Sequence, residues 1–455
     1  MLILAGQHSE GDPYETLEQV SSDIISDYVE GWHDSFLVCP LFSSLPCRHG
    51  VRWTPRCLAY VAIMMVWDSG RTLCARFQEA RATVVEMFSG RRRPGRTHRG
   101  FVEALLRQGP SILPSILETL RRSMQEIAGP YWRREGLLAF AVDGSRVDCP
   151  RTRANEDALG CAGRKGTGPQ FWLTTLWHMG TGLPWGWKIG PSDDAERMHL
   201  RQMLGLLPRG ALLVADAGFT GYDLFREILS SGRSLLVRVG ANVSLLRKLG
   251  YAEVERDGTV YLWPEAFQKK GRPPIVLRLI VLRRRGKAMY LVTNLSVTEL
   301  PTKRAAVLYE LRWGIEVFFR SLKQTLAHRK MLSRAPRQAE AELQWTLVGL
   351  KVLGLMSVSA IVDDGHDPLS WSVALALRAV RQSMRDRKPT HRCPGGLTGA
   401  LGRSLKDRYS RRKPKAARNW PHKKKERPPG APQLRNAKPK EIKKAQKLTD
   451  AKQAA

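Results

Sequence analysis

The sequence has no Cys-x-x-Cys pair among its seven cysteines and no recognisable targeting segment. Scattered cysteines in odd number argue against a disulfide framework or a zinc ribbon, so we expect reduced thiols. The start, MLILAGQHSEGDPYE, lacks the basic region and apolar run of a signal peptide. The longest apolar stretch, 346–362, contains Lys351 and is marginal for a membrane span. We therefore predict a buried helix there, and a soluble cytoplasmic protein without a membrane partner.

Acidic residues are scarce relative to basic ones. The chain has 74 Lys and Arg against 42 Asp and Glu, a formal net charge of +32. Such a charge repels itself and favours a polyanionic partner, for which nucleic acid is a better candidate than an anionic membrane. The glycine-rich segment 160–168 lacks the Gly-Lys-Ser/Thr order of a phosphate-binding loop, so we expect no nucleotide cofactor.

The first part of the chain, residues 1–130, is predicted to be helical. Apolar residues recur there at spacings of three and four. The arginine-rich segment 89–100 is either a solvated loop or a phosphate contact, and the charge of the whole chain favours the second interpretation. We therefore expect residues 1–130 to be a helical N-terminal DNA-binding region.

The pattern changes near residue 131, where short apolar runs bounded by Gly, Pro or Asp indicate strands. They alternate with helical segments, which predicts an α/β core over 131–365. The stretch 217–305 is rich in strands, with turns expected at Asp257-Gly258 and within 283–288. One long helix is predicted over 303–331 and an apolar helix over 340–362, with a further helix in 366–400.

The end of the chain, residues 401–455, contains 19 Lys and Arg against 4 Asp and Glu, a net charge of +15. Large apolar residues are almost absent after Trp420. Such a segment cannot bury enough surface to offset its ordering entropy. We predict a basic disordered tail.

Two predicted strands end in the same way. LLAFAVDG places Asp143 after an apolar run and before Gly144, and ALLVADAG places Asp216 similarly, two residues before Gly218. Taken singly, each aspartate has the pattern of a turn or helix-cap residue. A third carboxylate in a suitable place is needed before either indicates catalysis.

The predicted helix 303–331 supplies that carboxylate. At about 100° per residue, Tyr309, Arg312, Glu316 and Lys323 fall on one narrow arc beside a wide apolar stripe. Arg312 and Glu316 alone are explained by an i,i+4 ion pair, but the ordered row of four is not. Three carboxylates are suitable ligands for two divalent ions in phosphodiester cleavage, and the row supplies cations for phosphate.

The motif Tyr309-x2-Arg312-x3-Glu316-x6-Lys323 resembles the signature of bacterial cut-and-paste transposases of the insertion-sequence-four group. The segments 291–295 and 212–225 are similar to that group too. The resemblance covers roughly 135–335. It implies a ribonuclease H-like α/β core with a β-rich insertion at about 217–305, a catalytic and metal-binding triad of Asp143, Asp216 and Glu316, and DNA contacts from Tyr309, Arg312 and Lys323. It further implies two Mg²⁺ ions per site, replaceable by Mn²⁺, and a homodimer on DNA, for which 366–400 is a possible contact.

Some assignments stay open at this point. Trp263 is a candidate for a base-flipping residue only by its location, and a core position is the better interpretation. Arg197 and His199 either approach the site or belong to a surface helix. The alternatives to a transposase are a structure-selective nuclease of the same fold and a catalytically decayed DNA-binding protein. A transposase would act on the bacterial nucleoid, in the cytoplasm.

Overall fold

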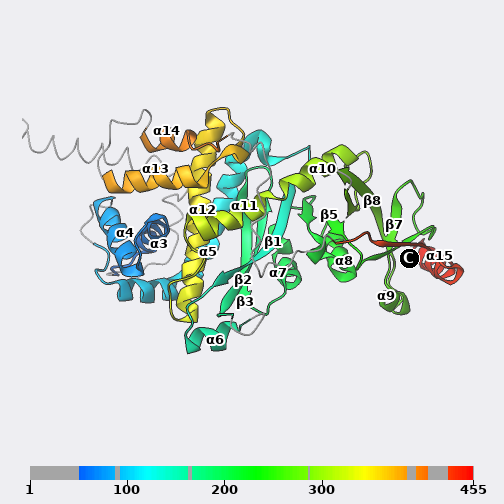
Figure 1. The fold of residues 1–455 in the computed structure, drawn as a ribbon, viewed down its shortest axis with the longest axis horizontal. Helices are drawn as coiled ribbons and strands as arrows, with labels where there is room; N and C mark the ends of the chain where they lie inside the picture. Colours follow the sequence, from blue (N-terminus) through cyan, green and yellow to red (C-terminus); the bar gives the residue numbers. More distant parts are fainter. Residues whose placement is uncertain are drawn as a thin grey trace, which may run out of the picture. The chain divides into compact units, whose positions relative to one another are not determined.

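The computed structural model describes residues 51–87, 93–161, 167–284, 287–386, 396–407 and 429–453. They form two compact units (Figure 1). Unit 1 combines residues 1–127 with 337–406, and unit 2 combines 128–336 with 407–455. The predicted helix before residue 51, the arginines at 91 and 92 and the tail segment 408–428 lie outside the described residues.

Unit 1 is helical throughout its described part. Its helices are α3 (Pro55–Trp67), α4 (Leu73–Met87), α5 (His98–Ala128), α12 (Pro336–Asp363), α13 (Val373–Asp386) and α14 (Gly396–Gly402). Helix α3 begins where the Thr54 hydroxyl accepts from the Cys57 amide. It packs tightly against α12, because Trp67 Nε1 donates to the Gly349 carbonyl at 2.9 Å and Gly349 has no side chain to meet Val66. Within the described residues, the helical prediction for the N-terminal region is confirmed over 55–67, 73–87 and 98–128.

Helix α12 contains the apolar stretch singled out in the sequence. Among the described residues it is the one helix long and apolar enough to cross a membrane, yet 89% of its most apolar window is buried inside the protein. Lys351 itself is fully buried, and burial lowers its pKa well below the usual range. The prediction of a buried helix is confirmed.

Unit 2 is built on one ten-stranded sheet in the order β10-β6-β7-β8-β9-β5-β4-β1-β2-β3. Its strands are β1 (Ala139–Asp148), β2 (Gln170–His178), β3 (Leu183–Pro191), β4 (Leu212–Ala215), β5 (Ser234–Val239), β6 (Ser244–Arg247), β7 (Thr259–Leu262), β8 (Ile275–Arg284), β9 (Lys287–Thr293) and β10 (Gln433–Asn436). With the helices around it, the sheet makes a mixed α/β fold.

One half of the sheet is the part that carries the two aspartates. Strands β1, β2 and β3 form an antiparallel meander, and β4 and β5 are parallel to β1. Parallel neighbours need a crossover, which helix α8 (Tyr222–Ser230) makes between β4 and β5. Helix α8 and strand β5 therefore belong to this half, and the strand-rich insertion is shorter than the predicted 217–305, since it begins only after β5.

The other half of the sheet is antiparallel from β5 to β6. Strands β8 and β9 form the hairpin predicted within 283–288, and a turn at Asp257-Gly258, with Gly258 at φ +84°, precedes β7. Helix α9 (Glu265–Lys269) lies between β7 and β8.

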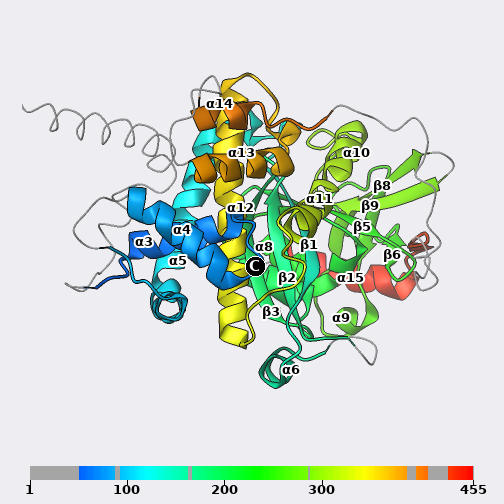
Figure 2. The same cartoon turned by 60° about the vertical axis from the view of Figure 1, so that its left-hand side comes forward.

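The end of the chain differs from the predicted disordered tail. Residues of β10 pair in parallel with β6, and helix α15 (Pro439–Gln453) follows (Figure 2). Arg435 bonds Glu441 through two nitrogens at 2.7 and 2.8 Å, and the Lys438 amide donates to Glu441 at 2.8 Å. Backbone pairing and this ion pair supply the stabilisation that apolar burial does not, so the prediction is wrong for residues 433–453.

The predicted helix 303–331 is interrupted. It consists of α10 (Thr302–Leu311), α11 (Gly314–Arg320) and a π-helical turn, η4 (Ser321–Thr325). Gly314 starts α11 because the backbone passes the ring of Trp177 closely, and a Cβ at this position would lie 2.1 Å from that ring. Glycine favours an interruption, since it is a poor residue for a helix interior.

The two units also differ from the predicted domain boundaries. Residues 337–365 were assigned to the core 131–365, but α12 belongs to unit 1 together with the N-terminal helices and residues 366–406. The physical reason is that most of α12 is apolar on every side, which requires burial among other helices rather than along one face of a sheet.

Candidate functional site

The two predicted aspartates lie on neighbouring parallel strands. Ala139, Phe140 and Ala141 of β1 pair with Leu212, Leu213 and Val214 of β4. Continuing this register by two residues places Asp143 beside Asp216, on strands about 4.8 Å apart. Strand β4 ends at Ala215, whereas β1 continues to Asp148. The sequence indicated that Asp143 lies at the end of its strand, but it lies inside β1. Its side chain is accessible because the neighbouring strand β4 ends before this point.

Each aspartate is fixed by a local backbone bond. Asp143 Oδ1 accepts from the Gly144 amide at 2.8 Å, and Asp216 Oδ1 accepts from the Gly218 amide at 2.8 Å. Asp216 also caps the short turn that follows it. One oxygen of each carboxylate is thereby oriented, and the second remains available for another contact.

Arg312 links Glu316 to Asp143, because its guanidinium contacts both carboxylates. Arg312 Nη2 donates to Glu316 Oε1 at 3.1 Å, and Arg312 Nη1 lies 3.7 Å from Asp143 Oδ2. Arg312 is only 8% exposed. Burial would lower its pKa, but Tyr309, Asp143, Asp216 and Glu316 together raise it. The structure therefore gathers all three predicted carboxylates around one buried guanidinium.

The charge of the site is not neutralised by that guanidinium. Burial raises the pKa of Asp143 to about 6, and the negative charges of Asp216 and Glu316 act in the same direction. The Gly144 amide and Arg312 oppose the shift without cancelling it. A carboxylate whose pKa is raised by burial and by like charges is a common mark of a functional site.

Two further predicted residues lie nearby. Tyr309 is 7% exposed, with the Arg312 guanidinium 5.5 Å from its ring centre. Its buried hydroxyl has no hydrogen-bond partner at bonding distance in the described part of the chain. Lys323 Nζ donates to the Ser145 hydroxyl at 2.7 Å, two residues beyond Asp143. Thus Arg312 and Tyr309 are buried beside the carboxylates rather than displayed on an open helix face.

A fourth carboxylate that the sequence did not single out belongs to the same cluster. Glu196 begins helix α7 (Glu196–Met203), after β3. Burial, with the charges of Asp143 and Asp216 acting in the same direction, raises its pKa to about 7. In the sequence this residue has only the pattern of a first-turn glutamate, which a helix N-terminus favours without any catalytic role.

The cluster has the donor atoms that a divalent ion prefers. Its donors are carboxylate oxygens, the ligands that hard ions such as Mg²⁺ prefer, and it holds excess negative charge. Over the described ranges, however, no three His, Cys, Asp or Glu side chains lie close enough together to hold one ion. The donor chemistry fits, and a shared ion requires these side chains to turn toward one another, away from Arg312.

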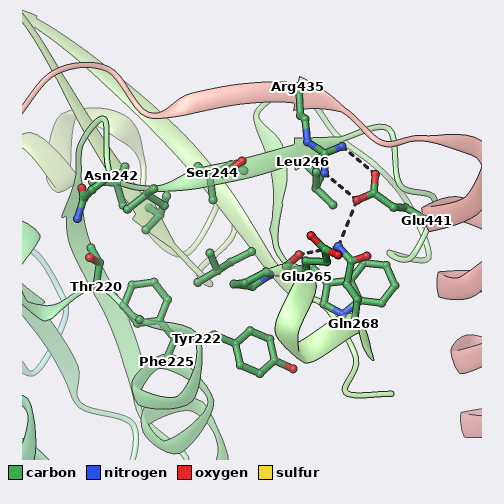
Figure 3. Close-up of a pocket in the computed structure, with 18 of the residues that line it drawn as sticks. Thr220, Tyr222, Phe225, Asn242, Ser244, Leu246, Glu265, Gln268, Arg435 and Glu441 are labelled. Atoms are coloured by element: carbon green, nitrogen blue, oxygen red, sulfur yellow. Dashed lines mark hydrogen bonds and ion pairs between the residues drawn. The ribbon is translucent and has the colours of Figure 1, made fainter. Parts of the chain in front are cut away.

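A cavity of about 770 Å³ lies beside the Asp216 loop (Figure 3). Arg197 and Thr220 line it next to that loop, and Arg435 and Glu441 line it from the C-terminal segment. Trp263 is also in its wall but is 2% exposed, with Nε1 donating to the Arg272 carbonyl at 2.7 Å. That bonding is typical of a core residue.

Residues 134–349 match the family model described as a transposase DDE domain. The match supports the resemblance of this part of the chain to DDE transposases of the insertion-sequence-four group. DDE domains of this kind use divalent metal ions, which agrees with the donor chemistry of the cluster.

Curated relatives agree with the family. The chain is 25% identical over 238 residues to transposase InsG for insertion sequence element IS4 of Escherichia coli, covering 49% of this chain and 52% of that protein. It is 29% identical over 154 residues to putative transposase y4zB of Sinorhizobium fredii, covering 32% of this chain and 42% of that one. The matches thus span about half the length of each relative.

Among solved structures, the piggyBac transposase synaptic complex with hairpin DNA is similar at a TM-score of 0.38. The sequence identity is 11%, over 85% of this chain and 84% of that one. Likeness at this level supports no conclusion about the DDE domain of this chain.

Proposed function

We propose that the chain is a DNA transposase that binds the terminal inverted repeats of an insertion sequence, cleaves the strands there and joins the 3′-hydroxyl ends to target DNA. The observation that carries the proposal is the β1–β4 register, which sets Asp143 beside Asp216, together with the Arg312 contacts that bring Glu316 to them. The catalytic and metal-binding residues are Asp143, Asp216 and Glu316.

Asp143, Asp216 and Glu316 would hold two Mg²⁺ ions, for which Mn²⁺ would substitute, and such ions would supply activation of the attacking oxygen and charge stabilisation at the phosphate. The chain's own residues prepare this site. The amides of Gly144 and Gly218 orient one oxygen of each aspartate. When the contacts of Arg312 with Asp143 and Glu316 break, its planar guanidinium becomes available to bind a phosphate, for which it is well suited.

The core of unit 2 is proposed to be ribonuclease H-like. Three antiparallel strands followed by two strands parallel to the first, in the order β3-β2-β1-β4-β5, support this assignment. Strands β6–β9 then form the β-rich insertion of the resemblance.

Binding to the transposon end is assigned to Tyr309, Arg312 and Lys323. The unpaired Tyr309 hydroxyl and the Lys323 ammonium lie beside the catalytic carboxylates, where the cleaved phosphate must come. The helices of unit 1 and the basic segments supply the remaining contacts, in keeping with a net charge of +32. We expect a homodimer on DNA, with α13 as a contact, acting on the bacterial nucleoid in the cytoplasm.

Strand transfer with purified protein tests the proposal. Duplexes carrying the inverted repeats that flank the coding region are mixed with supercoiled plasmid and Mg²⁺. Wild type should insert the 3′ ends, and Asp143→Asn should bind the duplex equally but insert nothing. Asp257→Asn, in the turn before β7, is the control and should act like wild type.

The two alternative functions give other outcomes. A structure-selective nuclease of the same core would cut DNA without joining any 3′ end to the plasmid. A decayed DNA-binding protein would bind the repeats and show no reaction, so that Asp143→Asn would change nothing. Either result would overturn the transposase proposal.

A further inference from the structure

Glu196 is a partly buried acidic residue in the site and is not one of the three proposed ligands. Its helix, α7, follows the strand β3 and has no side-chain cap at Ala195, so the helix start is defined by backbone contacts alone. The groups that act on the Glu196 carboxylate do so through their charges: Asp143, Asp216, Arg197 and Arg146. A partly buried carboxylate that faces two other carboxylates is unfavourable unless a cation joins them.

The carboxylate of Glu196 lies between the two aspartate loops. A Cβ at Gly144 would lie 2.8 Å from Glu196 Oε1, and a Cβ at Gly218 would lie 3.8 Å from Glu196 Oε2. One oxygen thus faces the residue after Asp143, and the other faces the loop after Asp216. Gly144 leaves the space that the carboxylate occupies, because a side chain there would displace it.

Helix α7 is held so that Glu196 keeps this position. The His199 ring is 2% exposed and bonded on both nitrogens, to the Thr174 hydroxyl of β2 and to Asp194, each at 2.9 Å. Gly190 makes room for Asp194, since a Cβ there would lie 1.8 Å from its carboxylate. These bonds anchor α7 to the same sheet that carries Asp143.

A second anchor ties α7 to the other aspartate. Arg197 Nε donates to the Gly218 carbonyl at 2.7 Å. The cations that face Glu196 electrostatically are Arg197 and Arg146, and neither pairs with it at bonding distance. The contacts thus fix the helix on both sides of the site but leave the Glu196 oxygens unused, as metal ligands require.

We infer that Glu196 is a fourth oxygen ligand of the divalent ions, facing the space between Asp143 and Asp216. This inference rests on the proposed metal-dependent function. A first-turn glutamate that only favours the helix dipole would also sit at this position in the helix. A carboxylate that binds the ion must change metal affinity, whereas one that only favours the helix dipole need not.

Mn²⁺ binding to the full chain without DNA separates these roles, measured as the free Mn²⁺ signal in electron paramagnetic resonance. Glu196→Gln is nearly isosteric and should weaken Mn²⁺ binding about tenfold, as Asp143→Asn should. Glu196→Asp keeps a carboxylate on a shorter arm and should recover part of the affinity. Glu253→Gln, an exposed residue of the insertion, is the matched control and should leave affinity unchanged.

The outcomes distinguish the inference from the proposed function. If Asp143→Asn weakens Mn²⁺ binding and Glu196→Gln does not, the ligand role of Glu196 is wrong and the triad stands. If neither variant changes Mn²⁺ binding, the metal-dependent function fails as well. Near-ultraviolet circular dichroism checks the fold, and Glu196→Gln should not lose stability in EDTA, because it removes a partly buried charge that Asp143 and Asp216 repel.

Discussion

Carboxylates are treated in opposite ways in the two halves of the sheet of unit 2. In the antiparallel half, Glu441 receives two bonds from Arg435 and one each from the Lys438 amide and Gln268. The Arg435 bonds, with the others, lower its pKa to about 2. In the half that carries Asp143 and Asp216, burial raises the pKa of Asp143 to about 6 and that of Glu196, at the start of α7, to about 7.

The difference separates holding the fold together from holding a ligand. Glu441 is matched by a cation and donors, so its charge stabilises the folded chain. Asp143 and Glu196 face other carboxylates, so their charges cost stability until a cation arrives. Natural proteins accept such local conflict at functional sites. The following predictions test this contrast, from the largest expected effect to the smallest.

The largest effect is expected on catalysis. Asp216→Asn should lower the rate of 3′-end cleavage by about a thousandfold or more, because one carboxylate that acts as part of a unit is lost. Glu441→Gln should leave that rate within about twofold. Single-turnover cleavage of end-labelled duplex measures both. Equal losses in the two variants would remove the contrast between the halves.

The second effect is on stability and its dependence on pH. The pKa of Asp143 in the folded chain is about 6, above the ordinary 3.8, so ionisation favours the unfolded chain as pH rises through this interval. In EDTA, Asp143→Asn should match wild type near pH 4 and be more stable by about 2–3 kcal/mol at pH 8. Urea unfolding at several pH values measures this, and a gap independent of pH would contradict it.

The third effect is local and lies in the antiparallel half. Glu441→Gln removes the charge that bonds Arg435, which should release β10 and the start of α15 at a cost of about 1–2 kcal/mol. Hydrogen exchange should become faster at the amides of 433–445 while β1 and β4 keep their protection. The control is Glu265→Gln, which loses only an exposed ion pair with Lys269.

The smallest effect concerns binding of DNA without sequence preference. Lys443 and Lys447 are exposed on α15. If both contact phosphates, changing them to Gln should reduce the slope of log affinity against log salt by roughly two. Fluorescence anisotropy on random duplex at several salt concentrations gives this slope. An unchanged slope would remove α15 from the DNA surface.

The sequence predicted the triad because its evidence is local. Strand patterns place Asp143 and Asp216, and the row from Tyr309 to Lys323 lies within fifteen consecutive residues. Glu196 was missed because a glutamate at a helix start has an ordinary explanation. Its role depends on Gly144 and Gly218, which are distant in sequence from it and from each other.

The same reasoning accounts for the C-terminal segment. Its composition predicts disorder, and nothing local indicates that Gln433–Asn436 pair with Ser244–Arg247. Such pairing is decided by an open strand edge elsewhere in the chain. The break at Gly314 was likewise invisible, because it depends on the Trp177 ring of a different element.

The parallel pairing of β10 with β6 has a consequence for how the protein is made. A ribosome releases β6 to β9 long before it reaches residue 433, so the edge of the sheet at β6 stays unpaired for as long as the whole of unit 1's second segment is being synthesised. An exposed edge of this kind is open to strands of other chains. Strand β10, which emerges after β6, therefore protects this edge by pairing with it, and nascent chains on crowded polysomes should be the most liable to aggregate.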